Sequence, residues 1–313
     1  MKTITPKILG KTDLVISPIG LGTMQWGDIP LPRSAADQPH PVVQAIYQTS
    51  LDMGISFFDT AEVYGSGRSE RHLAMSLRGS SEGRVIATKF MPYPWRLSKG
   101  ELRKALIISL QRLGLERIDL YQMHWPIPPV PIKTWMEAMA DVFAEGLVRA
   151  VGVSNYSVQQ TEQAQLALTK YGIPLASNQV KYSLLDRHPE SSGLVEFCNR
   201  SGITIIAYSP LEKGMLTGKY TPDNLPTGFR AWRYNRAFLV KIEPLMSELR
   251  DIGKKYDGKT PGQVALNWLI AKGAVPIPGA KDVDQAKENA AAMGWQISAD
   301  DVEKLERLSQ SFM

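Results

Sequence analysis

A chain of 313 residues with 43% hydrophobic and 21% charged side chains is long enough to bury a large core and is not disordered. Its formal net charge is +5, yet Lys and Arg are scattered along the chain, which argues against a nucleic-acid-binding protein. The one cysteine, Cys198, excludes an intrachain disulfide, and the lack of a signal-peptide core or of an apolar run of about 20 residues favours a cytoplasmic protein outside the membrane.

Residues 7–17 form a predicted β-hairpin whose turn lies near residues 10–13 and which is expected to close the bottom of a barrel. Beyond it, short apolar runs alternate with helical patterns. Several of these runs are rich in β-branched side chains, as is typical of buried parallel strands. The predicted strands are residues 19–21, 56–59, 85–89, 119–124, 150–153, 176–180, 204–208 and 274–277.

Several helices are predicted from N-terminal capping pairs, in which Ser or Thr is followed three residues later by Glu, Gln or Asp. These pairs are Ser98 with Glu101, Ser157 with Gln160, Thr260 with Gln263, and Ser298 with Asp301, the last of which opens a C-terminal helix. Two long loops are expected, one rich in proline at residues 28–41 and one rich in glycine and basic side chains at residues 211–236. Loops of this length in a compact domain are usually functional or disordered.

Eight strands that alternate with helices are compatible with a (β/α)8 barrel or with a doubly wound parallel sheet. A dinucleotide-binding doubly wound sheet would carry G-x-G-x-x-G after its first strand. Gly20-x-Gly22 and Gly65-x-Gly67 both lack the third glycine, so the barrel is favoured. No change in composition marks a domain boundary. The predicted fold is therefore one α/β domain over residues 1–313, a (β/α)8 TIM barrel with an N-terminal β-hairpin and a C-terminal helix.

Polar side chains follow three consecutive strands of this predicted barrel. Asp59 and Tyr64 follow the second strand, Lys89 ends the third and His124 ends the fourth. Barrel enzymes carry their chemistry at the carboxyl ends of the strands, so these four residues are expected to meet at one rim. Taken singly, Asp59 is compatible with a helix cap, Lys89 with a solvated charge and His124 with a core histidine. Their coincidence favours a catalytic site.

These four side chains together can reduce a carbonyl group. Tyr64 would protonate the alkoxide that forms on the carbonyl oxygen, and the Lys89 ammonium is expected to lower the pKa of Tyr64 toward the working pH. Asp59 would hold Lys89, and His124 would orient the carbonyl oxygen. The histidines share no metal-ligand spacing, so no metal site is predicted and an organic cofactor is favoured as the hydride source.

Asp59-Thr60-Ala61-x-x-Tyr64-Gly65, Thr88-Lys89 and His124-Trp125 resemble the catalytic motifs of the aldo-keto reductase family. The resemblance extends over nearly the whole chain, from Gly20-Leu21-Gly22-Thr23 to Glu288-Asn289. It implies a (β/α)8 barrel that binds NADP(H) without a Rossmann motif and that reduces an aldehyde or ketone. It also implies that Tyr64, Lys89, Asp59 and His124 are catalytic.

The resemblance assigns the nicotinamide end of NADP(H) to Ser154, Asn155 and Gln179, which would hold the amide, and to Tyr208, on which the ring would stack. The adenosine end is assigned to Gly279, Lys281, Gln285, Glu288 and Asn289. Gly279 and Gln285 depart from the lysine and arginine of many members and resemble the branch of potassium-channel β-subunits and bacterial general-stress reductases. A moderate preference for NADPH over NADH is therefore expected, with Lys281 as the contact for the 2′-phosphate.

The remaining cofactor contacts implied by the resemblance lie in two segments, one being Gly22 and Thr23 and the other Ser209, Pro210, Leu211, Gly214, Gly218 and Lys219. Within the second segment, Gly214–Lys219 is similar to the family's flexible belt over the pyrophosphate. Its glycine amides suit that role, as do the basic side chains Lys213, Lys219, Arg230, Arg233 and Arg236, for which no acidic partner is evident within the segment. The alternative is that these basic side chains simply face water.

The predicted substrate pocket contains aromatic side chains, namely Trp26, Tyr93, Trp95 and Trp125, with Trp232 as a further candidate. They favour an apolar or planar small-molecule carbonyl substrate, although ordinary packing is the alternative. An NADPH-binding sensor or accessory subunit with little turnover is the second functional hypothesis. A barrel glycosidase is disfavoured because no second acid lies on a late strand. The sequence predicts no particular oligomeric state.

Overall fold

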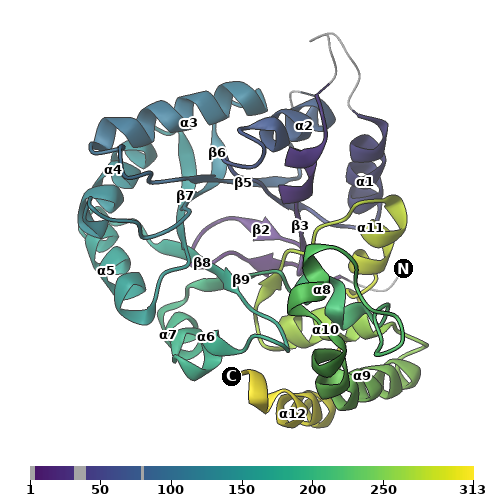
Figure 1. Ribbon diagram of the computed structural model, residues 1–313. Coiled ribbons are helices and arrows are strands. Elements are labelled where there is room, and N and C mark those ends of the chain that lie inside the picture. The colour runs from purple at the N-terminus through teal and green to yellow at the C-terminus, as the bar shows by residue number, and fades with distance from the viewer. Residues whose placement is uncertain (1–3, 32–39, 79–80) are drawn as a thin grey trace.

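Eight parallel strands form the centre of the molecule and helices surround them (Figure 1) in the computed structural model, which describes residues 4–31, 40–78 and 81–313. Neighbouring strands pair in chain order from β3 to β10. They are β3 (Gly20–Gly22), β4 (Phe57–Asp59), β5 (Val85–Phe90), β6 (Ile118–Met123), β7 (Val148–Ser154), β8 (Leu175–Lys181), β9 (Thr204–Tyr208) and β10 (Val275–Pro276). The predicted (β/α)8 barrel is confirmed, with small shifts at the strand ends.

The barrel is nearly closed between its first and last strands. The backbone N–H of Gly22 donates to the carbonyl of Pro278 at 3.1 Å, which connects the end of β3 to the segment that follows β10. A Cβ atom at Gly22 would lie 2.8 Å from the carbonyl oxygen of Ile277, and one at Gly20 would lie 2.5 Å from the Phe57 ring. Glycine is therefore required at these positions because the strands approach too closely for a side chain.

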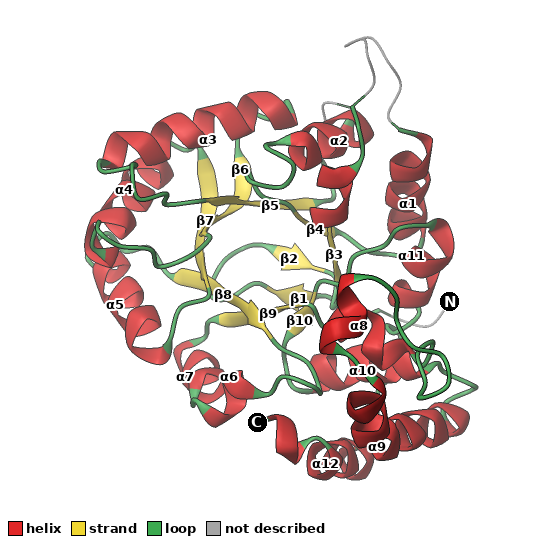
Figure 2. Ribbon diagram, viewed as in Figure 1, coloured by secondary structure: helices red, strands yellow, loops and turns green. Residues whose placement is uncertain are grey.

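The helices lie on the outside of the strands (Figure 2). The helices between and after the barrel strands are α1 (Pro41–Asp52), α2 (Arg68–Leu77), α3 (Lys99–Leu113), α4 (Ile132–Ala144), α5 (Val158–Thr169), α6 (His188–Ser191), α7 (Leu194–Ser201), α8 (Phe229–Arg233), α9 (Arg236–Lys255), α10 (Pro261–Ala271) and α11 (Val283–Ala290). The predicted C-terminal helix is α12 (Ala299–Leu308), which packs beside α9. The described residues also form three 3₁₀ helices, namely η1 (Met24–Asp28), η2 (Glu212–Thr217) and η3 (Gln310–Phe312).

Three of the four predicted capping pairs form side-chain hydrogen bonds at the start of a helix, and the fourth does not. Ser157 with Gln160, and Thr260 with Gln263, form reciprocal capping boxes at the starts of α5 and α10. Ser298 caps α12 by accepting from the backbone N–H of Asp301. Ser98 stands at the start of α3 but makes no capping hydrogen bond, and Glu101 instead accepts from Lys104. The capping box predicted there is wrong because an exposed ion pair takes the Glu101 carboxylate.

The N-terminal hairpin closes the barrel from below, as predicted. Its strands are β1 (Lys7–Ile8) and β2 (Val15–Ile16), and Leu9, Leu14 and Ile16 pack against inward-facing side chains of the barrel strands. The backbone N–H of Gly10 donates to the side chain of Thr204, the first residue of β9, at 2.8 Å. The hairpin therefore lies at the amino-terminal end of the strands, away from the predicted catalytic rim.

The two predicted long loops are only partly loops. Residues 32–39 of the first lie outside the described residues. The second, residues 211–236, contains η2 and α8, and Thr221 forms a bridge with Asn224. Arg236 also contacts Asp223 at 3.2 Å, so the expectation that this segment offers its basic side chains no acidic partner is wrong.

In the part of the chain that the structure describes, no helix is long and apolar enough to span a membrane.

Candidate active site

The ammonium of Lys89 is the centre of a buried polar cluster at the carboxyl ends of the strands. Lys89 lies in β5 and its side chain is fully buried. Its Nζ donates to the Asp59 carboxylate at 2.5 Å and to the backbone carbonyl of Thr60 at 2.8 Å, and it lies 3.4 Å from the Tyr64 hydroxyl. The three N–H donors of an ammonium thus each have an acceptor. Three of the four predicted catalytic residues meet at this atom.

The pKa values of this cluster follow from burial and from its charges. Burial alone would lower the pKa of Lys89, but Asp59 and Tyr64 raise it above its usual value, so Lys89 is charged. Burial raises the pKa of Tyr64, Lys89 opposes that effect and Asp59 adds to it, and the result is a pKa above the usual value. The Lys89 ammonium thus lowers the pKa of Tyr64, as expected, but burial raises it by more, so the pKa does not fall toward the working pH. Tyr64 is a neutral phenol that can donate its proton.

His124, which directly follows β6, faces Tyr64. The two rings are 5.9 Å apart in an edge-to-face arrangement. Burial, together with the charge of Lys89, lowers the pKa of His124 to about 3, so its imidazole is neutral. Its backbone is fixed by hydrogen bonds to Phe90 and from Asn155, while its Nδ1 is buried without a hydrogen-bond partner among the described residues. A neutral imidazole beside the phenol can hydrogen-bond a carbonyl oxygen without adding a charge.

A glutamine that sequence reasoning missed supports Asp59 from the barrel interior. Asp59 accepts from Lys89 through Oδ1 and from Gln179 and Gln122 through Oδ2, at 2.8 and 3.2 Å. Gln122 lies on β6, two residues before His124 in the inward-facing alternation of that strand. Gln122 could therefore have been predicted as an inward-facing residue from this alternation along the strand. These bonds hold the carboxylate in one orientation toward Lys89.

The segment that carries Tyr64 is tied to β3 by hydroxyl groups and by a glycine contact. Thr23, a predicted cofactor residue at the end of β3, donates to the carbonyl of Asp59 at 3.0 Å, and Ser69 donates to the carbonyl of Thr23. A Cβ at Gly65, whose φ is +60°, would lie 2.1 Å from the carbonyl oxygen of Gly27. The backbone on either side of Tyr64 is thereby held against η1.

The residues predicted to hold the nicotinamide lie together on β7, β8 and β9, except Asn155, which directly follows β7. The Ser154 hydroxyl donates to the carbonyl of Gln179 at 2.8 Å, and Asn155 donates to the Ser154 oxygen at 3.0 Å. The Tyr208 hydroxyl donates to the Asn155 side-chain oxygen at 2.9 Å, and burial raises the pKa of Tyr208 to about 12. Asn155 has a left-handed φ of +62°, which directs its amide into this cluster.

The predicted adenosine residues gather around the start of α11. The Gln285 side chain accepts from the backbone N–H of Lys281 and donates to Asp282, whose carboxylate also caps the helix. The Asn289 amide donates to the carbonyl of Gly279 at 3.2 Å, while the side chain of Glu288 accepts from Thr260. Lys281 itself is exposed. Asp282, which the sequence did not single out, places a carboxylate next to the predicted phosphate contact.

The predicted belt is anchored to the barrel at both ends by a second buried carboxylate. Glu212, at the start of η2, contacts Lys181 at 2.9 Å and accepts from the Tyr234 hydroxyl at 2.7 Å. Lys181 ends β8 and also contacts Asp186 at 2.8 Å. The intervening Gly214 and Gly218 have positive φ values, as do Ser209 and Lys213. Of the predicted contacts, Gly214, Gly218 and Lys219 lie within this anchored segment, whereas Ser209, Pro210 and Leu211 lie between β9 and Glu212.

The predicted pocket aromatics differ in exposure. Trp26 is 1% exposed and belongs to the hydrophobic core, so in this structure it packs rather than faces an open pocket. Trp125 is 42% exposed next to His124, and Trp232 on α8 is 82% exposed. Tyr93 and Trp95 stack in parallel, with ring centres 4.6 Å apart. An aromatic surface is therefore present beyond β5 and β6.

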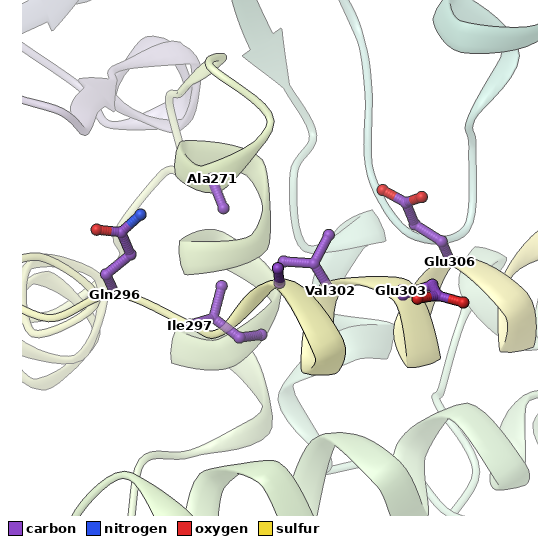
Figure 3. A pocket seen from close by; sticks show the side chains of 7 residues that line it. Ala271, Gln296, Ile297, Val302, Glu303 and Glu306 are labelled. Carbon is purple, nitrogen blue, oxygen red and sulfur yellow. The ribbon is translucent and has the colours of Figure 1, made fainter.

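A cavity of about 330 Å³ lies elsewhere, between the end of α10 and α12 (Figure 3). Its lining side chains include Ala271, Ile297, Val302 and Glu306, and none of the residues described above belongs to it. Within the described ranges, no three or more His, Cys, Asp or Glu side chains form a group that could hold a metal ion.

The whole barrel has known relatives. The sequence profile of the Aldo/keto reductase family matches residues 18–310. The chain belongs to this family. Its members are oxidoreductases, and the Lys89 cluster lies on the motifs by which the sequence resembles them.

Two curated relatives show the range within the family. The chain is 42% identical over 310 residues to "Pyridoxal reductase, chloroplastic" of Arabidopsis thaliana, an alignment that covers 94% of this chain and 83% of the relative. It is 30% identical over 331 residues to the "NADH-specific methylglyoxal reductase" of Escherichia coli, over 97% and 98% of the two chains. A solved aldo-keto reductase from Klebsiella pneumoniae in complex with NADPH has 26% identity, a TM-score of 0.74 and 96% coverage of both chains.

Proposed function

We propose that this aldo-keto reductase reduces an aldehyde or ketone to an alcohol with NADPH and that Tyr64 is the proton donor. The observation that carries the proposal is the buried Lys89 ammonium, which lies 2.5 Å from Asp59 and 3.4 Å from the Tyr64 hydroxyl. A fully buried, charged lysine does not stabilise a hydrophobic core, so its fixed carboxylate partner and its position beside a tyrosine favour a catalytic role. Such perturbed groups are typical of catalytic sites.

Each of the four residues has a role in the proposed reaction. Tyr64, kept neutral by its raised pKa, donates its proton to the carbonyl oxygen as negative charge develops there. Lys89 then stabilises the phenolate that remains, and Asp59 keeps Lys89 charged and in place. His124, also neutral, hydrogen-bonds the carbonyl oxygen and orients it.

The nicotinamide cofactor would be held by the amide cluster of Ser154, Asn155 and Gln179, with Tyr208 beside it. These side chains fit an amide, because they combine donors and acceptors near Asp59 at the same end of the barrel. When bound, the cofactor supplies the hydride. Gly22, Thr23, the residues of the belt and those around α11 would hold its phosphates and adenosine.

NADPH is proposed in preference to NADH because Lys281 is exposed at the start of α11, where it can meet a 2′-phosphate. The preference is proposed to be moderate. Asp282 puts a negative charge beside Lys281, and the relatives include both an NADH-specific enzyme and one solved with NADPH.

An aromatic aldehyde is the proposed substrate class. The relative with 42% identity is a pyridoxal reductase, and pyridoxal is a heteroaromatic aldehyde. The exposed side chains of Trp95 and Trp125, with the half-buried Tyr93 stacked on Trp95, suit a planar compound. The reaction would take place in a reducing compartment such as the cytoplasm, where the buried thiol of Cys198 stays unpaired.

The test is steady-state oxidation of NADPH and of NADH, followed at 340 nm, with pyridoxal, 4-nitrobenzaldehyde and propanal. Turnover with NADPH that persists in excess EDTA is expected. Tight NADPH binding without turnover of any aldehyde or ketone would instead support a sensor or accessory subunit. A lack of binding to both cofactors would overturn the proposal.

A further inference from the structure

Arg96 connects the segment that carries Tyr64 with the aromatic segment that follows β5. Its guanidinium donates to both oxygens of Glu62, at 2.5 and 3.1 Å, in a bidentate pair. Glu62 lies between Asp59 and Tyr64 in the sequence. The side chains of Arg96 and Glu62 are 18% and 9% exposed, so water screens this pair little.

The same pair fixes the backbone of Met91, two residues after Lys89. The Met91 N–H donates to Glu62 at 2.7 Å, and Arg96 donates to the Met91 carbonyl at 2.8 Å. Side chains therefore bind both polar groups of this residue's backbone, and the carbonyl also accepts from the backbone N–H of Tyr93 at 2.8 Å. Met91 is thereby connected to the segment that carries Tyr64.

Arg96 also supports a stack of aromatic rings. Its guanidinium lies 4.8 Å from the centre of the Phe90 ring and 5.4 Å from that of Tyr93. Tyr93 in turn stacks on Trp95 with the ring planes only 5° apart. Trp95 is 72% exposed. The arrangement thus keeps a large aromatic surface ordered and open to solvent, where an isolated tryptophan would be free to rotate.

We propose that Arg96 is a positioning residue for substrate choice. Through its hydrogen bonds to Glu62 and Met91, Arg96 holds the Tyr93–Trp95 stack in place relative to Tyr64. The open ring face of the stack then favours aromatic over small aliphatic aldehydes. This inference rests on the carbonyl reduction proposed above. An ordered ring face binds a planar ligand without a further loss of side-chain entropy. Without Arg96, the stack loses its inner neighbour and Met91 loses one of its three hydrogen bonds.

The experiment compares kcat and KM for 4-nitrobenzaldehyde and for propanal in Arg96→Gln, Arg96→Lys and Trp95→Ala. Arg103→Gln is the matched control, because the Nε of Arg103 also contacts both carboxylate oxygens of a glutamate, Glu145, but on the exposed surface. For Arg96→Gln and Trp95→Ala, the KM for 4-nitrobenzaldehyde should rise about 2- to 10-fold, the range expected for a lost aromatic contact. The KM for propanal should rise much less, and Arg96→Lys should restore part of the difference.

Folding is controlled with Glu62→Gln combined with Arg96→Gln. This pair of changes leaves no unpaired buried carboxylate, and the glutamine introduced in place of Glu62 keeps an oxygen for the Met91 N–H. The double variant should show the same selective rise in KM. An equal rise for both aldehydes, or no rise in Trp95→Ala, would overturn the inference while leaving carbonyl reduction intact. A wild-type enzyme that reduces no aldehyde or ketone would instead refute the proposed function.

Discussion

At the scale of single residues, charge and burial act against each other on Tyr64. The Lys89 ammonium lies 5.0 Å from the centre of the Tyr64 ring and lowers the pKa of the phenol, while the loss of water raises it by more. The phenol is therefore protonated throughout the neutral range. This state suits an acid in the reducing direction, and Lys89 contributes mainly by stabilising the phenolate once the proton has left.

Tyr64→Phe should remove the proton donor and leave the rest of the cluster in place. General acid catalysis contributes roughly 10²- to 10⁴-fold, and kcat for aldehyde reduction should fall by about that factor. Steady-state rates measure the loss, and NADPH fluorescence titration should give a nearly unchanged Kd. Tyr171→Phe, at an exposed tyrosine, is the control. A Tyr64→Phe enzyme with more than about half of the wild-type rate would show that another group is the acid.

Lys89→Met should lower kcat and move the alkaline limb of the pH–rate profile to higher pH. The sign follows from the charges: removal of the ammonium removes the contribution that lowers the pKa of Tyr64, and burial remains. Asp59→Asn in the same chain avoids an unpaired buried carboxylate. Full pH–rate profiles of the single and double variants make the test. An active variant whose alkaline limb has not moved would contradict the proposed role of Lys89.

Lys281→Ala should weaken NADPH binding and spare NADH. A charge-assisted contact is worth roughly 1.5–3 kcal/mol, which corresponds to about a 10- to 150-fold change in Kd. Lys287→Ala, an exposed lysine on the same helix α11, controls for a general change of surface charge. Fluorescence titrations with both cofactors give the four Kd values. Equal losses for NADPH and NADH would mean that Lys281 does not distinguish the 2′-phosphate.

At the scale of elements, residues 211–236 are held near both ends by the contacts of Glu212. Glu212 joins Lys181 and Tyr234, so any closing movement belongs to the part of the segment between Glu212 and Tyr234. Gly214, Gly218 and Gly228 have positive φ values within that part. These glycines give the backbone more freedom than other residues would.

NADPH should protect this segment from trypsin. The proposed reason is that the pyrophosphate attracts the basic side chains and orders the segment over the cofactor. Without the cofactor, cleavage is expected after Lys219, Arg230 or Arg233, and mass spectrometry of the fragments identifies the sites. Nicotinamide riboside, which carries no phosphate, is the control and should not protect. Equal cleavage with and without saturating NADPH would rule out closure, and the basic residues would then simply face water.

At the scale of the whole molecule, the hairpin of β1 and β2 completes the core of the barrel. Leu9→Ala should lower the melting temperature, because deletion of a fully buried leucine side chain costs about 2–5 kcal/mol. Differential scanning calorimetry measures the shift. Ile8→Ala, next to it and 60% exposed, should change the melting temperature little. An equal effect of the two substitutions would show that the hairpin does not seal the core.

The sequence by itself determined the order of the elements, the barrel and the residues that meet at Lys89. Short apolar runs rich in β-branched residues, alternating with helical patterns, identify buried parallel strands from local sequence alone. In a barrel, the carboxyl ends of such strands lie at one rim. The strand register then brings Asp59 beside Lys89 across the neighbouring strands β4 and β5. Each of these steps follows from local sequence patterns and from the general geometry of a (β/α)8 barrel.

Only the tertiary structure decided what depends on burial and on partners distant in the sequence. The direction of the pKa shift of Tyr64 depends on how much water surrounds its hydroxyl, which no motif records. Likewise, Trp26 lies in the core although its position suggested a pocket, and Arg96 pairs with Glu62 from 34 residues away. Burial and long-range pairing are properties of the packed chain, because each depends on every element that excludes water from the site.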